Sequence, residues 1–275
     1  MTDDPEPPEN ISGGTSGGGQ ADVFDPATAG TRAEAVVDRL GERYWTKIYG
    51  GQAAFECLVR TILSQNTSDT ASQPAHDALM DRYGDGDDLA AALADADLDT
   101  LAETISSAGL YNQKSEVITD TAEWVVDRFG SAAAFDEFVT DEPPETVRET
   151  LLDVRGVGPK TADCVLLFAG GSPGVFPVDT HVHRIYRRLG VAPPDADHEA
   201  VRAVLEREVP AEKCGFGHTA SIQFGREFCT ARQPACLDDP EACPMADLCD
   251  QVGVSPATGE VVDPADAAEA GVADD

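Results

Sequence analysis

Long apolar segments are missing from this 275-residue chain, and no run approaches the roughly 20 apolar residues that span a membrane. The first residues are acidic, whereas a secretory signal begins with basic residues followed by an apolar stretch. Seven cysteines in a chain without such a signal are not expected to form a disulfide framework. We therefore expect a soluble, cytoplasmic protein with no membrane partner.

The chain also contains few basic residues, and lysine in particular is rare. Lysine and arginine total 19 against 51 aspartate and glutamate residues, which gives a formal net charge of −32 at pH 7. The chain has four lysines, and aromatic residues make up 6% of it. This composition resembles that of proteins from salt-accumulating halophiles such as halophilic archaea, in which salt screens the repulsion between acids. An ordinary acidic protein is the alternative.

The acidic excess has one local exception. Between Arg148 and Arg188, six bases face four acids, a net charge of +2, while residues 1–21 and 252–275 contain acids and no base. DNA, a polyanion, would be repelled by the chain as a whole. A less acidic strip on an acidic protein therefore indicates a surface that faces nucleic acid, with chance variation in a short window as the alternative.

Strict alternation of apolar and polar residues, the pattern of a half-buried strand, is also missing. Apolar residues recur instead at helical spacing from Ala33 onward, and Phe55, Leu58 and Ile62 mark a strongly buried helix. We predict an all-α chain with helices over residues 32–44, 55–63, 71–83, 97–107, 115–129, 145–153, 160–169, 180–189, 198–208 and 218–228.

A glycine turn lies between two of these helices. Gly156 and Gly158 flank Val157, and Pro159 and Lys160 follow at the start of the next helix. Glycines let the backbone turn sharply and leave N–H groups exposed, and the positive end of the next helix points the same way. This arrangement suits a phosphate group. Lys160 is unusual in a first helical turn, where the macrodipole favours acids.

Asp179 follows Lys160 by nineteen residues, within the sequence Val-Asp-Thr-His. The glycine hairpin, Lys160 and Asp179 together resemble the helix-hairpin-helix base excision DNA glycosylases, most closely the endonuclease III branch. The resemblance covers residues 33–251. It implies that Lys160 attacks the sugar of a damaged nucleotide and that Asp179 supplies the carboxylate near the reacting carbon. It also implies that Gly156 and Gly158 contact the DNA backbone.

The same resemblance implies two helical domains, with the helix-hairpin-helix at their junction and an iron–sulfur cluster loop near the C-terminus. One domain would contain residues 50–174, including the helix-hairpin-helix at about 148–168. The other, cluster-bearing domain would combine residues 22–49 and 175–251. The two ends, residues 1–21 and 252–275, are predicted to be disordered acidic tails.

A polar segment from Ser64 to Asp69 follows the buried helix and is too rich in amides to be core. The family has a short polar segment at this place, which fills the gap that an expelled base leaves in the DNA. Such a wedge is needed because an unstacked hole in duplex DNA costs a few kcal/mol. By register, Asn66 takes the wedge position with Gln65 beside it. An amide-capped helix end is the alternative.

Two further groups are implied to contact DNA. The turn at 109–114 resembles the family's second DNA-contacting turn, which would bring three side chains to the DNA: Tyr111, Asn112 and Lys114. Arg184 and Arg187 follow Asp179 on one predicted helix and would contact phosphates. The alternatives are a structural turn and solvated surface charge.

Four of the cysteines lie close together: Cys229, Cys236, Cys243 and Cys249, with gaps of six, six and five residues. Four thiolates without histidine suit one [4Fe–4S] cluster or a tetrahedral zinc, and the absence of paired CxxC motifs favours iron–sulfur. In the endonuclease III family the middle gap is two residues, so the loop here is four residues longer, which costs little entropy. The other three are predicted to pack in the core: Cys57, Cys164 and Cys214.

These features predict a bifunctional DNA glycosylase and AP lyase of base excision repair that acts as a nucleoid-associated monomer on double-stranded DNA with damaged bases or abasic sites. The resemblance implies excision of oxidised pyrimidines and strand cleavage by β-elimination. A monofunctional mismatch glycosylase and a non-catalytic iron–sulfur DNA-binding protein are the alternatives. The adenine-specific relatives lack the hairpin lysine and carry a glutamate where this chain has Thr61. Lys160 and Asp179 together argue against a protein without activity.

Overall fold

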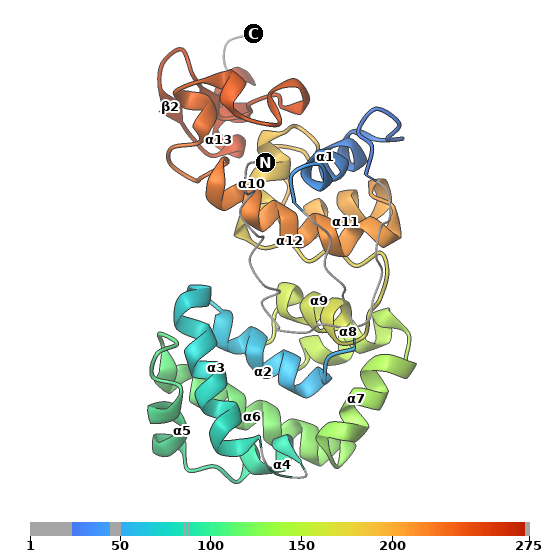
Figure 1. Ribbon diagram of the computed structural model, residues 1–275, viewed down its shortest axis with the longest axis vertical. Helices are drawn as coiled ribbons and strands as arrows, with labels where there is room; N and C mark the ends of the chain where they lie inside the picture. The colour runs from blue at the N-terminus through green and yellow to red at the C-terminus, as the bar shows by residue number, and fades with distance from the viewer. Residues whose placement is uncertain (1–23, 45–50, 85, 87, 273–275) are drawn as a thin grey trace, which may run out of the picture. The chain divides into compact units, whose positions relative to one another are not determined.

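A computed structural model of the chain describes residues 24–44, 51–84, 86 and 88–272 (Figure 1). The predicted disordered segment 1–21 lies outside these residues. Helices dominate the described chain, whose one sheet is a two-stranded antiparallel ladder. The prediction of an all-α chain is confirmed. In this part of the chain no helix has both the length and the apolar composition needed to cross a membrane.

The elements follow one another along the chain. They are α1 (Arg32–Gly41), α2 (Ala54–Ser64), α3 (Asp69–Tyr83), α4 (Leu89–Ala94), α5 (Leu98–Thr104), α6 (Tyr111–Phe129), α7 (Ala132–Asp141), α8 (Pro144–Leu152), α9 (Pro159–Phe168), α10 (Thr180–Arg188), α11 (His198–Glu208), α12 (Ala211–Glu227), the 3₁₀ turns η1 (Ala235–Leu237), η2 (Pro240–Ala242) and η3 (Ala246–Leu248), the strands β1 (Val254–Ser255) and β2 (Glu260–Val261), and α13 (Pro264–Val272).

These elements form two compact units. The first unit contains α2 to α9, within residues 51–172. The second unit combines α1 with residues 173–272, so that a helix near the start of the chain packs with α11, α12 and η3 of the cysteine-rich segment. The glycine hairpin and Lys160 therefore belong to the first unit, and Asp179 belongs to the second.

Helix α2 is the centre of the first unit and packs against α3, α6, α7 and α9 (Figure 1). Nine of its eleven residues are buried, as expected of a helix that is apolar on most of its surface. No side chain of its own caps its start. Asp136 of α7 supplies the cap and accepts hydrogen bonds from the backbone N–H groups of Ala54 and Phe55 at 2.7 and 3.1 Å. The core thus fixes the helix that leads into the polar segment 64–69.

Helix α12 has the same role in the second unit, where it packs against α1, α10 and α11. The sequence predicts its start at residue 218, yet the helix begins at Ala211. Gly215 and Gly217 obscure the helical pattern because glycine disfavours helix interiors. Space explains Gly217: a Cβ there would lie 2.6 Å from the Phe176 ring. This glycine permits close packing and does not end the helix.

The predicted disorder of residues 252–275 is wrong for residues 252–272. Val254 and Ser255 pair with Val261 and Glu260 in the β1–β2 ladder, and α13 follows. The buried Arg187 of α10 forms an ion pair with Asp263, just before α13. Acid content suggested disorder, but a partner 76 residues away in the sequence gives one of these acids a structural role.

Candidate nucleic-acid interface and cluster site

The hairpin between α8 and α9 is a tight turn with an apolar underside. Val154 and Val157 are buried, and the Val157 N–H donates to the Val154 carbonyl at 3.0 Å. Gly156 has a φ of +82°, in the left-handed region that favours glycine. A Cβ at this position would also lie 2.7 Å from Cγ1 of Val117 in α6. The turn therefore needs glycine both for its backbone and for its contact with α6.

Gly158 is glycine for a different reason. Its backbone is extended, with φ −98° and ψ 176°, a conformation open to any residue. No atom of the described chain lies within 4 Å of where its Cβ would be. It stands directly before α9 and supplies no capping side chain, so the first N–H groups of that helix are available to an outside acceptor. An anion suits such a position.

Lys160 lies in the first turn of α9 and is half-buried. Within the described residues no carboxylate pairs with it. The two hairpin helices are held together by another pair, because Arg148 Nε of α8 donates to Oδ1 of the buried Asp163 in α9 at 2.7 Å. That pair fixes α8 against α9, and Lys160 stands two residues after Gly158, whose backbone is open.

The polar segment after α2 is tied to this hairpin. Gln65 Nε2 donates to the Gly156 carbonyl and to Thr161 Oγ1, each at 3.1 Å. Asn66, the next residue, is exposed and has a φ of +52°, which asparagine tolerates better than most residues. The predicted wedge residue therefore projects from a strained turn that a neighbouring amide fastens to the hairpin.

The turn before α6 carries an exposed apolar residue that the sequence analysis missed. Leu110 has a φ of +59° and its side chain is 59% exposed. Tyr111 and Asn112, both predicted to contact DNA, are exposed beside it. A leucine in an otherwise polar glycine turn is the signal that could have revealed it, because apolar side chains are unusual at exposed turns. Leu110 is thus a further candidate for a wedge.

Lys114 was predicted to contact DNA, and the structure corrects this. Its side chain is buried, and Nζ donates to the Leu63 carbonyl and to Thr67 Oγ1, both at 2.6 Å. A third carbonyl, that of Ala108, lies 3.5 Å away. Burial lowers the pKa of Lys114 to about 8. Because its donors point into the protein, this lysine supports the loops and does not bind phosphate.

Asp179 begins α10 in the second unit. Its Oδ1 accepts a hydrogen bond from the Val182 N–H at 2.8 Å, so the carboxylate caps the helix. The described residues offer no hydrogen-bond donor to Oδ2. His181 is next but one, and burial lowers its pKa. The cap fixes the direction of the carboxylate.

Arg184 and Arg187 were predicted to contact phosphates, but in the structure both guanidinium groups donate to groups of the protein itself. Arg184 donates from Nε and NH2 to the Cys229 carbonyl at 3.1 and 2.9 Å. Arg187 is buried and donates from Nε to the Pro194 carbonyl at 2.6 Å, in addition to its pair with Asp263. Helical spacing alone cannot tell an inward-facing arginine from an outward-facing one.

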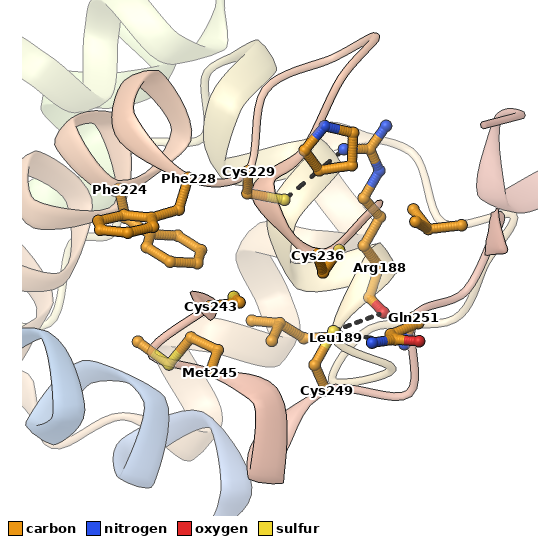
Figure 2. A pocket seen from close by; sticks show the side chains of 12 residues that line it. Arg188, Leu189, Phe224, Phe228, Cys229, Cys236, Cys243, Met245, Cys249 and Gln251 are labelled. Carbon is orange, nitrogen blue, oxygen red and sulfur yellow. Dashed lines mark hydrogen bonds between the residues drawn. The ribbon is translucent and has the colours of Figure 1, made fainter. Parts of the chain in front are cut away.

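The four clustered cysteines line one pocket in the second unit, as Figure 2 shows. The sulfurs are held by their surroundings: Arg188 NH1 lies 3.6 Å from Cys229 Sγ, and the Gln251 N–H donates to Cys249 Sγ at 3.3 Å. The longer middle gap forms the turns η1 and η2 and still leaves Cys236 and Cys243 on the cavity. Apolar side chains of Phe224, Phe228 and Met245 complete the wall.

The four thiols suit an iron–sulfur cluster. In the described residues no three His, Cys, Asp or Glu side chains converge closely enough to bind one ion. Four sulfurs spread around a cavity fit a polynuclear centre better than a tetrahedral zinc. Burial raises the pKa of Cys243 to about 11 and that of Cys249 to about 12. Cluster binding must therefore displace protons from these thiols.

Residues 59–211 match the HhH-GPD superfamily of base excision DNA repair proteins, more than half of the chain. Endonuclease III of Thermotoga maritima is 31% identical over 71% of this chain and 82% of its own length. The chain belongs to the endonuclease III branch of the HhH-GPD superfamily. Its predicted family is confirmed.

Solved endonuclease III structures extend this likeness to three dimensions. A non-covalent endonuclease III–DNA complex and a trapped endonuclease III–DNA covalent intermediate each match with a TM-score of 0.65 and 26% identity. Each match covers 80% of this chain and 96% of the solved chain. Like these relatives, this endonuclease III family member binds DNA.

Residues 229–249 match the iron–sulfur binding domain of endonuclease III, which begins and ends at the outer two clustered cysteines. This endonuclease III family member has one [4Fe–4S] cluster as its cofactor, as predicted, and the zinc alternative is not supported.

Proposed function

We propose that this chain is a bifunctional DNA glycosylase and AP lyase that excises damaged bases, oxidised pyrimidines in particular, and cuts the strand at abasic sites. The observation that carries the proposal is that Lys160, which has no carboxylate partner among the described residues, lies in the first turn of α9 directly after the open backbone of Gly158. Phosphate at the start of α9 would place the adjacent sugar near this amine. An exposed backbone that binds phosphate and a free nucleophile are both needed for attack on a nucleotide.

The chemistry assigns each catalytic residue one task. Lys160 Nζ, once deprotonated, attacks C1′, and the bond between C1′ and the base nitrogen breaks with its electron pair going to the base. Asp179 stabilises the positive charge that develops on the sugar or accepts the proton of the nucleophile. The lysine–sugar adduct opens to a Schiff base, and loss of a C2′ proton then expels the 3′ phosphate oxygen. Water releases the lysine.

Base extrusion is the task of the exposed turns. A base reaches a pocket only after leaving the stack, and the hole must be filled by side chains. Asn66 and Leu110 are exposed residues on two separate turns of the first unit. An apolar wedge unstacks bases, and an amide can hydrogen-bond the base left without a partner. We assign Leu110 the first role and Asn66 the second, with Tyr111 and Asn112 beside the extruded nucleotide.

The cofactor has its own place in the proposal. Cys229, Cys236, Cys243 and Cys249 would hold the cluster. When bound, it cross-links four points of a segment that has little regular structure. Its binding would stabilise the fold around the end of α10, the helix that Asp179 caps, and it takes no part in the steps above.

Borohydride trapping on duplex DNA with an abasic site tests the proposal. The wild type should form a covalent adduct, and Lys160→Ala should form none while it binds the same DNA within severalfold. Arg155→Gln is the matched control, because it removes a nearby exposed charge that pairs with Asp120 but leaves the amine intact. Undiminished trapping by Lys160→Ala would refute the assignment. Base release without any trapping by the wild type would favour a monofunctional glycosylase. Duplexes that carry different lesions then define the substrate range.

A further inference from the structure

The buried amine of Lys114 joins three segments of the first unit. It donates to the Leu63 carbonyl at the end of α2 and to Thr67 Oγ1 in the polar segment, and it lies near the Ala108 carbonyl before the Leu110 turn. Leu63 belongs to the last turn of its helix, where carbonyls lack a partner within the helix and attract cations. The two exposed turns are thus bound to one nitrogen atom.

The contacts continue from Lys114 to the hairpin. The Thr67 hydroxyl accepts from Lys114 Nζ and donates to the Gln65 carbonyl at 3.1 Å. The Gln65 side chain in turn donates to the Gly156 carbonyl and to Thr161 Oγ1. An unbroken series of hydrogen bonds therefore leads from the Leu110 turn, through the Asn66 segment, to the residues that flank Lys160.

The chemistry of this position calls for an ammonium group. Lysine is the one side chain that offers three donors from a single atom, which matches three oxygen acceptors around one point. Burying a charge is costly, so its presence here needs compensation by these bonds. If a buried lysine had no structural or functional role, replacing it with methionine would make the protein more stable. The cost of burying the charged Lys114 is explained if its hydrogen bonds fix the conformation of the two turns.

We propose that Lys114, Thr67 and Gln65 form a positioning relay that holds the Asn66 and Leu110 turns rigid with respect to the hairpin, so that both enter the duplex together. The proposal rests on the function inferred above. None of the three side chains needs to touch the reacting atoms. The relay serves the opening of the duplex and not the attack of Lys160 on the sugar.

Two abasic substrates separate these steps. On duplex DNA the nucleotide must be extruded before Lys160 reaches it, whereas single-stranded abasic DNA needs no extrusion. Lys114→Met should lower the borohydride trapping rate on duplex by about 10-fold or more, the loss expected for hydrogen bonds from a charged group. Trapping on the single strand should stay within twofold. With 2-aminopurine opposite the abasic site, wild-type binding should raise the fluorescence of this base by unstacking it, and the variant should not.

Three controls make the outcome decisive. Lys213→Met removes a lysine of the second unit that pairs with Glu34 and Asp38, and it should reduce stability without changing the duplex to single-strand ratio. Thr67→Val breaks the relay and should repeat the selective loss, while Thr67→Ser keeps the hydroxyl and should restore it. This pair decides the matter if Lys114→Met fails to fold.

The possible results are distinguishable. An equal fall of trapping on both substrates in Lys114→Met and Thr67→Val would overturn the relay and leave the proposed function intact. Absence of trapping by the wild type on both substrates would overturn the proposed function itself.

Discussion

Lys114, Lys160 and Lys213 have the same side chain in three different surroundings. Lys160 is half-buried without a carboxylate partner in the described chain, Lys114 is buried among carbonyl and hydroxyl oxygens, and Lys213 pairs with two carboxylates. An amine that already donates all its protons to the protein is a poor nucleophile. In a chain with so few lysines, surroundings rather than number identify the reactive one.

Asp179→Asn should separate catalysis from folding. The asparagine Oδ1 can still accept the Val182 N–H, so the cap of α10 and the thermal unfolding midpoint should persist. The carboxylate charge is lost, and base excision should fall by about 100-fold or more, the effect of a missing general base or charge stabiliser. Single-turnover excision with calorimetry on the same preparation measures both. Near-wild-type excision would reduce Asp179 to a helix cap.

The lowered pKa of Lys114 predicts that the stability of the protein depends on pH. Burial lowers its pKa from 10.5 to about 8 in the folded chain. Between about pH 8 and pH 10 the unfolded lysine keeps its proton while the folded one has lost it, so the unfolded state binds more protons and stability rises with pH. The free energy of unfolding of the wild type, relative to Lys114→Met, should therefore increase across this window. Urea titrations at several pH values measure it, and a flat difference would contradict the shifted pKa.

The arginines of α10 show what residue patterns cannot reveal. Sequence spacing placed Arg184 and Arg187 on one helix, which is correct. Their partners are a carbonyl at residue 229 and a carboxylate at residue 263, far along the chain. Because such contacts depend on tertiary packing, the sequence predicted the residues and not their direction. Lys160 and Asp179 were easier to single out as candidates, since each stands at a helix start that glycine or capping chemistry marks.

At the scale of elements, α10 connects two parts of the second unit. Asp179 caps its start, and Arg184 and Arg188 near its end donate to carbonyls of residues 229–231 in the cluster segment. Val252 N–H returns to the Arg188 carbonyl at 3.0 Å, so the chain after the last cysteine is fixed to the same helix. One helix thereby carries the proposed catalytic carboxylate and supports the cofactor segment.

Asp263→Ala tests the role of the segment that includes β1, β2 and α13. The change leaves the buried guanidinium of Arg187 without its carboxylate and should lower the free energy of unfolding by about 1–2 kcal/mol, a moderate loss because Asp263 itself is 54% exposed. Denaturant unfolding measures the loss. The double variant Arg187→Met/Asp263→Ala should recover part of it, because no buried charge is then left unpaired. No effect of the single change would indicate that the segment is dispensable for stability.

Most long helices were predictable, whereas helices that are short or lack a clear apolar period were missed or misplaced. α4 has six residues, fewer than two turns, so no apolar period can develop; Asp88 marks it only through its cap. α7 begins with Ala-Ala-Ala, which has no amphipathic contrast. α12 begins earlier than predicted because its two glycines serve packing. Sequence patterns predict elements whose burial is periodic, and they fail where length or close contact replaces periodicity.

In the described part of the chain, many of the few bases pair with acids of the protein. Arg32, Arg39, Arg148 and Arg155 all pair with acids, as do Arg187 and Lys213. These contacts neutralise bases that could otherwise attract DNA. With a net charge of −32, the protein therefore repels an anionic ligand such as DNA, and few unpaired bases reduce this repulsion. The short-range contacts between the hairpin and DNA must overcome this long-range electrostatic repulsion.

Salt should therefore promote both folding and lyase activity. At about 1 M KCl the screening length is about 3 Å, which mutes distant acids but spares direct contacts. We expect the unfolding midpoint and the trapping rate to rise with KCl to a broad optimum at or above about 1 M, and binding to weaken again beyond it as counterions compete. A KCl series with both readouts measures this. Activity that peaks near 0.1 M and then only declines would contradict the screened-surface argument and leave the catalytic assignments untouched.

The two glycines of the hairpin are required for different reasons. Gly156 is fixed by the chain itself, through its positive φ and the side chain of Val117. At Gly158 the described chain leaves room for a methyl group, and the φ angle is one that any residue can adopt. Selection for glycine there must come from a molecule outside the protein. In a descendant that ceased to bind DNA, position 158 would drift to other residues while position 156 stayed glycine, and the pair would show from sequence alone that the ligand had been lost.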